Sequence, residues 1–304
     1  MLCLLPTQSN SNFFNKNNTG LGNVLYQLST VYCICKKFNL KFNSYYFNKY
    51  INKLKKLGFN HHLKIFGKID LSIQEEKIDL EFKEEYNYEF SNNLINIIKK
   101  NTNKNILIKD SYFQSIKYFI DYEKEIQQLF EPDIQFKELI NKKYPKIFDN
   151  KQSNICIQMR LNWGIGIKLN PEFILIAIDY LKKNNFIQNH INLWIFSDNI
   201  PEAKKILSCI KNYNIIFVND NQYDYEDLWM MSLINNHIVS FSTFSWWGAF
   251  LNQFENKKII YSEDFKSVFC EKILGKKWIN NSNTILDNTY PKNWIMLKNK
   301  YIIQ

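Results

Sequence analysis

Arginine is almost absent from this 304-residue chain. Of its 39 lysine and arginine residues only Arg160 is an arginine, although the formal net charge is +10. Lysine cannot reproduce the planar, two-pronged grip of a guanidinium group on phosphate or carboxylate. The single arginine is therefore either a chance survivor or a residue that a site requires, and its position in the sequence favours a site.

Long runs of one residue type are also missing. The lysines are scattered, with no run of five or more, so a solvated basic surface is expected and nucleic-acid binding is not. No apolar run reaches the roughly 18 residues of a membrane span. The beginning of the chain has no basic segment followed by a long apolar one, so we expect no signal peptide and a cytoplasmic location.

Paired cysteine motifs are absent as well. The six cysteines include no C-x-x-C pair, and the closely spaced Cys33 and Cys35 do not make a zinc site by themselves. Reduced, mostly buried thiols are expected, and no metal site or D-x-D metal motif is predicted. The apolar fraction of 45% is sufficient for a sizeable core.

The order of the predicted elements indicates an α/β protein. From Ile155 onward, apolar strands alternate with helical segments, which is typical of a doubly wound parallel sheet. The first half begins similarly, with a strand at 2–5, a glycine loop and a helix from Val24 to Phe38. The polar stretch 141–153 reads as a linker. We therefore expect an N-terminal domain, a C-terminal domain and a tail that packs back on the first domain: 1–148, 149–285 and 286–304.

The region 226–252 is the most informative part of the chain. Apolar residues at helical spacing are followed by a short buried strand, 237–241, then by a cluster of small hydroxyl residues, and then by a second apolar helix from Trp246. A helix that begins after the carboxyl end of a strand favours anion binding through its first backbone N–H groups. Ser and Thr at such a place are equally typical of ordinary helix caps.

Two charged residues lie at the ends of other predicted strands. Arg160 ends the strand 155–160, where its partner is either a bound anion or an internal acidic residue. Asp198 follows the strand 191–196 and is either the cap of the helix from Pro201 or a site residue. Asp227 opens the next helix.

These motifs resemble those of the family-11 glycosyltransferases, the α-1,2-fucosyltransferases. The match runs through most of the 226–252 region, including Asp227, the hydroxyl cluster and Trp246-Trp247-Gly248, with Phe241 where the family usually has Asn. Gly22, Asn23 and Gln27 match the family's N-terminal motif. The family's H-x-R-R-x-D motif is altered: Gln158 replaces His, Arg160 is retained, Leu161 replaces the second Arg, and Trp163 stands at the Asp position.

The resemblance implies a GT-B fold, with two Rossmann-like domains facing a cleft. It implies an inverting, metal-independent transferase that moves L-fucose from GDP-β-L-fucose to a glycan hydroxyl and needs no cofactor. Alternatives are a same-fold transferase that uses another nucleotide sugar, and a non-catalytic sugar- or nucleotide-binding relative. Arg160 and Asp198 are the expected catalytic residues. The expected donor-binding residues are Gly22, Asn23, Gln158, Arg160, Asp227, Ser242, Thr243, Phe244 and Ser245.

Overall fold

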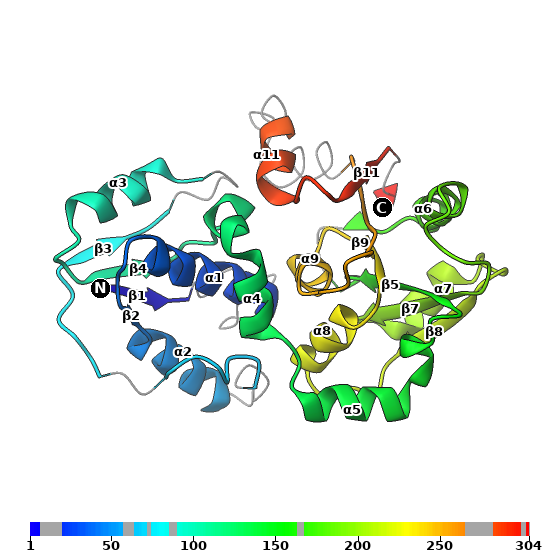
Figure 1. Ribbon diagram of the computed structural model, residues 1–304, viewed down its shortest axis with the longest axis horizontal. Coiled ribbons are helices and arrows are strands. Elements are labelled where there is room, and N and C mark those ends of the chain that lie inside the picture. The colour runs from blue at the N-terminus through cyan, green and yellow to red at the C-terminus, as the bar shows by residue number, and fades with distance from the viewer. Residues whose placement is uncertain are drawn as a thin grey trace. The chain divides into compact units, whose positions relative to one another are not determined.

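The computed structural model describes residues 1–6, 20–56, 64–71, 74–84, 90–162, 167–264, 282–298 and 302–303. The chain forms two α/β units, each built around its own parallel sheet, and the predicted α/β class with two Rossmann-like units is confirmed (Figure 1). The first unit comprises Met1–Phe130 with Thr284–Pro291, and the second comprises Glu131–Asn283 with Lys292–Gln304.

The division between the units falls earlier in the chain than the polar stretch 141–153. Part of that stretch is helical, because α5 (Ile134–Lys143) is followed by the 3-10 helix η4 (Pro145–Phe148). Aromatic contacts attach these two helices to the second unit. Phe136 of α5 packs on Trp229 with 5.3 Å between ring centroids, and Tyr144, between α5 and η4, packs on Trp194 at 5.6 Å.

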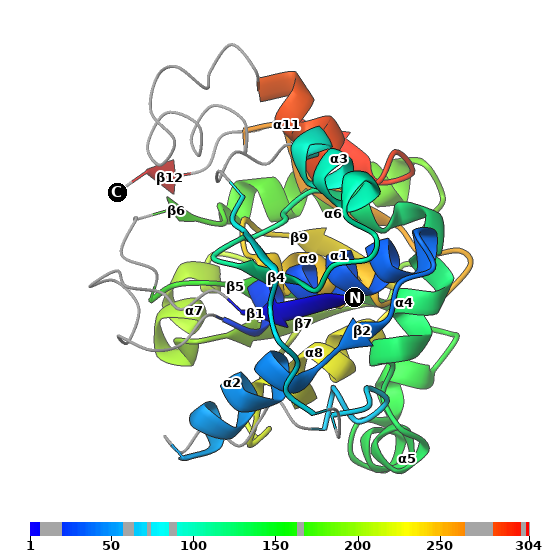
Figure 2. The ribbon, with the colours of Figure 1, turned by 90° about the vertical axis from the view of Figure 1, so that its left-hand side faces the viewer.

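The first unit contains a parallel four-stranded sheet within the described residues, in the order β2-β1-β4-β3. The buried strand β1 lies beside β4, and α1 and α2 are drawn on opposite sides of β1 (Figures 1 and 2). The elements are β1 (Leu2–Leu5), α1 (Leu21–Lys37), β2 (Phe42–Asn43), α2 (Tyr45–Lys56), β3 (Leu80–Phe82), α3 (Asn92–Lys100), β4 (Ile106–Lys109), η2 (Ile116–Tyr118), η3 (Ile120–Tyr122) and α4 (Glu123–Phe130).

The second unit contains a larger sheet, six parallel strands among the described residues, in the order β11-β10-β9-β5-β7-β8. The interior strands β5 and β7 are buried along almost their whole length and are mostly apolar, as is typical of a parallel sheet that helices cover. Besides α5 and η4 the elements are β5 (Ser153–Met159), β6 (Ile167–Lys168), α6 (Pro171–Lys183), β7 (Ile191–Ser197), α7 (Ile200–Leu207), β8 (Asn214–Val218), α8 (Asp224–Ser232), β9 (Asn236–Val239), α9 (Thr243–Phe250), β10 (Ile259–Ser262), β11 (Ile295–Leu297) and β12 (Ile302–Ile303).

Helix caps explain several boundaries and correct others. Asn170 caps α6 in front of Pro171, as the sequence predicts. The cap of α7 is Asn199, whose side chain accepts a hydrogen bond from the Glu202 backbone N–H, so of the two roles considered for Asp198 that of helix cap is excluded. Helix α8 begins at Asp224, one turn before the start predicted at Asp227, because a capping box closes its first turn.

In each sheet the strand order changes direction between two neighbouring interior strands. In the second unit the chain runs from β5 outward through β7 to β8 and then returns to the other side of β5 at β9. In the first unit the corresponding neighbours are β1 and β4. Ligands of open α/β sheets bind at the carboxyl ends of the strands beside such a reversal. The two reversals therefore mark where a site is expected in each unit.

The C-terminal segment is divided between the two units. Helix α11 (Ser282–Thr289) overlaps the part of the chain that belongs to the first unit, whereas β11 pairs in parallel with β10 of the second. Strand β12 pairs antiparallel with β6. In the described part of the chain, no helix is both long and apolar enough to cross a bilayer.

Helices α8 and α9 approach closely at Gly248. A Cβ atom added there would lie 2.2 Å from Cε and 2.9 Å from Cβ of Met231. Alanine favours a helix over glycine by about 1 kcal/mol, whereas overpacking a core costs about 1–3 kcal/mol. Because the Met231 Cβ cannot swing aside, the clash outweighs the gain.

Gly248→Ala should therefore lower the free energy of unfolding by about 1–2 kcal/mol, measured by urea titration. Gly20→Ala is the matched control, since a Cβ at Gly20 would meet nothing within 4 Å. The control should stay within about 0.5 kcal/mol of wild type. Equal stability of Gly248→Ala and wild type would refute the close approach.

Candidate functional site

The chain's arginine lies directly after β5, at the carboxyl edge of the second sheet. The Arg160 Nη1 atom is 3.2 Å from Oδ2 of Asp198, which follows β7. The Asp198 carboxylate also accepts hydrogen bonds from the backbone N–H groups of Leu161 (2.7 Å) and Asn162 (3.2 Å). Of the two partners considered for Arg160, the internal acidic residue is present. The Arg160 side chain remains 43% exposed, so one face of the guanidinium can still contact a ligand.

The hydroxyl cluster lies after the neighbouring strand, β9. Ser242 caps α9, its Oγ accepting from the Phe244 backbone N–H at 3.2 Å. Ser245 Oγ accepts from the Ser240 backbone N–H at 3.2 Å, so this hydroxyl holds the turn closed. Ser242, Thr243 and Phe244 are partly exposed, whereas Ser245 is buried. The side chains therefore shape the turn, and the helix N-terminus supplies its positive end.

Gln158 connects the two strands beneath this turn. It is 5% exposed, and its Oε1 atom accepts a hydrogen bond from the Ser240 hydroxyl at 3.1 Å. The pair joins β5 to the first residue after β9. Gln158 thus contributes to the site through the position of the turn.

Arg160 and the turn lie on the two strands that flank the reversal in strand order. The carboxyl ends of β5 and β9 share one edge of the sheet, since the strands are parallel neighbours. A guanidinium and the N-terminus of a helix both favour negative charge. This part of the second unit is therefore suited to an anionic group such as a phosphate.

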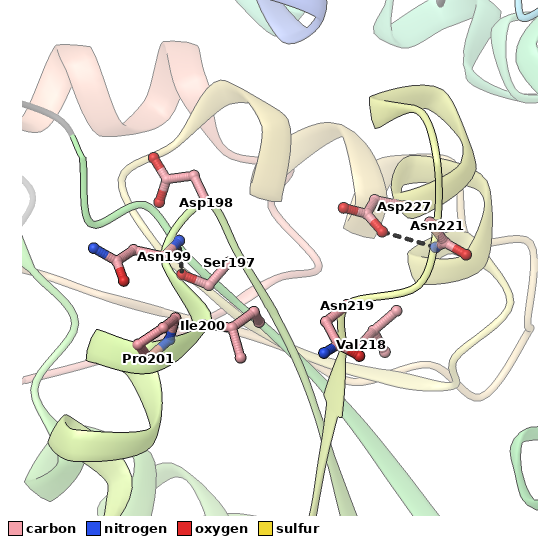
Figure 3. Close-up of a pocket in the computed structure, with 9 residues that line it drawn as sticks. All are labelled: Ser197, Asp198, Asn199, Ile200, Pro201, Val218, Asn219, Asn221 and Asp227. Atoms are coloured by element: carbon pink, nitrogen blue, oxygen red, sulfur yellow. Dashed lines mark hydrogen bonds between the residues drawn. The ribbon is translucent and has the colours of Figure 1, made fainter.

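A pocket of about 420 Å³ lies further along the same edge, at the ends of β7 and β8. Figure 3 shows Asp198 and Asn199, which follow β7, on one side, and Asn219, which follows β8, and Asp227 of α8 on the other. The Asn221 Nδ2 group donates to Asp227 Oδ1 at 2.7 Å and fixes that carboxylate. The pocket therefore presents acceptors and amide groups to a polar ligand.

Burial disfavours ionisation in this region. It raises the pKa of Asp227 to about 6, an effect that the hydrogen bond from Asn221 opposes and the charge of Glu226 increases. The Asp224 carboxyl, one turn earlier on α8, has its pKa raised to about 7 by burial. Near neutral pH an Asp227 carboxylate can accept hydrogen bonds, and at acid pH it becomes a donor.

The N-terminal motif residues lie in the first unit. Gly22 and Asn23 belong to the first turn of α1, and Gln27 is fully buried in the same helix. The Asn23 Oδ1 atom accepts a hydrogen bond at 2.8 Å from Nε2 of Gln114, in the loop after β4. The predicted site residues thus form two groups, one on each unit.

Several residues of the 226–252 region maintain the fold. His237 is buried, and its Nε2 atom lies 3.0 Å from the Ile234 carbonyl oxygen, which also accepts from Asn252 at 2.7 Å. Burial lowers the pKa of His237 to about 3, so the ring is neutral. Trp246 and Trp247 are core residues.

Sequence reasoning missed Asn221, which lies in a loop after a strand with no local pattern to distinguish it from other loop amides. It assigned no site role to the segment Tyr112-Phe113-Gln114 after β4, and the importance of Gln114 comes from the partner that it contacts. Trp163, at the altered motif, lies outside the described residues. In the described ranges, no group of three His, Cys, Asp or Glu residues is arranged as a metal site.

Sequence comparison relates the chain to glycosyltransferases. No family model matches it. The O-antigen biosynthesis glycosyltransferase WbnK of Escherichia coli is 27% identical over 201 residues, 64% of this chain and 65% of WbnK. The alpha-1,2-colitosyltransferase of Escherichia coli is 24% identical over 157 residues, 47% of this chain and 51% of that protein. The chain therefore matches less than two thirds of the length of either relative.

Solved structures with a similar arrangement are also glycosyltransferases. The fucosyltransferase NodZ from Bradyrhizobium has a TM-score of 0.45 and 10% identity, covering 82% of this chain and 91% of NodZ. The heptosyltransferase WaaC of E. coli, solved with ADP, has a TM-score of 0.39 and 11% identity, covering 98% and 93%.

The raised pKa of Asp227 makes stability depend on pH. Its folded-state pKa, about 6, exceeds the ordinary 3.8, so its contribution to stability is complete below about pH 4 and is lost as pH rises through about 6. Asp227→Asn does not titrate. The free energy of unfolding of Asp227→Asn minus that of wild type should therefore become more positive by roughly 2 kcal/mol as the pH rises from about 4 to about 8.

Denaturant titrations at both pH values measure this change. Asp179→Asn is the matched control, because Asp179 is 58% exposed on α6 and forms an i,i+4 ion pair with Lys183. Its difference from wild type should vary by less than about 0.5 kcal/mol. A pH-independent difference for Asp227→Asn would contradict the burial of this carboxyl group.

Proposed function

We propose that this protein is an inverting, metal-independent glycosyltransferase of the α-1,2-fucosyltransferase type. It transfers L-fucose from GDP-β-L-fucose to a hydroxyl group of a glycan. The observation that carries the proposal is the placement of the chain's arginine and the N-terminus of α9 on the two strands at the reversal of the second sheet. Relatives named as glycosyltransferases support the same class.

The chemistry follows from the charge of the leaving group. Breaking the bond between the sugar and the β-phosphate leaves both bonding electrons, and hence negative charge, on the departing nucleoside diphosphate. Groups that already point at this charge lower the barrier, because they need no rearrangement during the reaction. Arg160 and the first backbone N–H groups of α9 can donate hydrogen bonds to this charge without a metal ion.

Asp198 acts mainly by holding Arg160. Its carboxylate already accepts two backbone N–H groups and pairs with the guanidinium. These three contacts occupy both carboxylate oxygens and fix the carboxylate beside the guanidinium. The geometry therefore supports a role in orienting Arg160 more strongly than a role as the base that deprotonates the acceptor.

The nucleobase fits the pocket between the ends of β7 and β8. A guanine presents two donors, N1–H and N2–H, on one edge, and a carboxylate can accept both. Asp227, held by Asn221, is the acceptor that the pocket offers. Gln158 supports the neighbouring turn through Ser240.

A second candidate is a transferase of the same type with a different donor sugar. The relative named as an alpha-1,2-colitosyltransferase favours it, as does the altered motif at Gln158 and Leu161. A panel of nucleotide sugars in the same transfer assay separates the two candidates.

Arg160→Lys tests the phosphate assignment. Lysine keeps the charge but loses the two-pronged hydrogen bonding, so kcat/KM with GDP-fucose should fall at least about tenfold. Lys183→Arg is the matched control, since it exchanges the same two head groups in an exposed ion pair of the same unit and should leave kcat/KM unchanged.

Unaltered turnover in Arg160→Lys would reject the phosphate assignment. Metal independence is tested separately, because loss of transfer on adding EDTA would reject it.

A further inference from the structure

A buried carboxylate that the donor chemistry does not use lies in the first unit. Glu84, just after β3, is 8% exposed. Its Oε1 atom accepts from the Tyr118 hydroxyl at 2.8 Å and its Oε2 atom from the Phe113 backbone N–H at 3.1 Å. The Ser91 backbone N–H donates to the Tyr118 oxygen at 2.7 Å, which directs the tyrosine hydrogen toward Glu84.

Among the described residues, no cation pairs with this carboxylate. Burial raises its pKa to about 7, against the hydrogen bonds from Tyr118 and Phe113, which lower it. Burying an acidic group without a cation is costly, so a residue retained here must be needed for the hydrogen bonds it accepts.

Those hydrogen bonds hold a strained segment. Phe113 has a φ of 52°, a left-handed conformation that is costly for a bulky side chain. Its ring is buried against Tyr118, with 5.2 Å between centroids. The Glu84 backbone N–H also donates to Ser111 Oγ at 2.8 Å. Glu84 therefore fixes the loop after β4 from both sides of the strained residue.

The strained segment presents Gln114. A hydrogen bond from the Ser115 N–H to the Phe113 carbonyl, 2.7 Å long, closes a tight turn with Gln114 at its centre. From there Gln114 donates to Asn23 and joins the loop after β4 to the first turn of α1. These segments flank the reversal between β1 and β4, where a ligand of the first unit is expected.

The contact also orients the amide of Asn23. Because the Asn23 Oδ1 atom accepts the hydrogen bond from Gln114, the NH2 group of Asn23 points away from Gln114. An amide NH2 is suited to donate to an oxygen of a sugar. If Gln114 moved, the oxygen and nitrogen of Asn23 could exchange places, and the donor would be lost.

We propose that Glu84 is a positioning residue, which holds the loop 110–118 so that Gln114 orients Asn23 for hydrogen bonding to a sugar hydroxyl. The identity of the ligand rests on the proposed function, whereas the chain of contacts from Glu84 to Asn23 does not. Glu84 itself is buried and touches no ligand.

Glu84→Gln tests the positioning role. The amide oxygen can accept from either the Tyr118 hydroxyl or the Phe113 N–H, and the amide NH2 group then faces the other donor without forming a hydrogen bond. Glu81→Gln is the matched control: it makes the same change on β3, three residues earlier, in an exposed ion pair with Lys109. Glu84→Gln should lower kcat/KM for GDP-fucose about tenfold, which corresponds to one lost charge-assisted hydrogen bond. Affinity for GDP should stay within about twofold, since that binding belongs to the second unit.

Gln114→Glu tests the pathway, because a carboxylate cannot donate to the Asn23 oxygen. It should cause a similar loss, and the double variant Glu84→Gln, Gln114→Glu should lose no more than Gln114→Glu alone, as expected for residues that act through one contact. Additive losses would mean that Glu84 acts by general destabilisation and would overturn the proposal.

Hydrogen exchange separates failure of this proposal from failure of the proposed function. Glu84→Gln should speed amide exchange in peptides covering 110–118 and 21–27, and Glu81→Gln should change neither. This result supports the positioning role even if wild type transfers no fucose, in which case only the proposed function fails. Unchanged exchange, or full activity of Glu84→Gln beside an active wild type, would overturn the positioning role.

Discussion

The candidate donor site depends on the contacts of the Asp198 carboxylate, which join the end of β7 to the end of β5. It holds the backbone of Leu161 and Asn162 and pairs with Arg160. Without Asp198, only the backbone after β5 would determine where the long Arg160 side chain lies. Because the guanidinium remains partly exposed, the same arrangement that fixes its place leaves it able to bind an anion.

Both units use an acidic residue in the same way at the carboxyl edge of their sheets. In the second unit Asp198, after β7, accepts two backbone N–H groups from the chain after β5, and in the first unit Glu84, after β3, accepts one from the loop after β4. The environments differ in one respect. Asp198 faces an arginine, whereas Glu84 is buried and none of the described ion pairs includes it, and burial raises the pKa of Glu84 to about 7.

The sequence was sufficient for the parts of this picture that local pattern determines. Buried strands such as β5 and β7 and the Asn170 cap follow from apolar runs and cap chemistry. Strand order could not be predicted, because it depends on which strands pair across the chain. For the same reason the ion pair of Arg160 and the pairing of Gln114 with Asn23 could not be foreseen. The sequence could not decide between a cap and a site role for Asp198, because Asn199 beside it is equally suited to capping.

The most direct test of the account is calorimetric binding of GDP, UDP, ADP and dTDP to the purified protein. If the second unit binds a guanine nucleotide through Arg160, the turn before α9 and Asp227, GDP should bind at least about tenfold more tightly than the others, a difference of about 1.4 kcal/mol. Preference for another base would contradict the assignment of the pocket between β7 and β8. Absence of binding by all four nucleotides would contradict the account of the second unit as a nucleotide-sugar site.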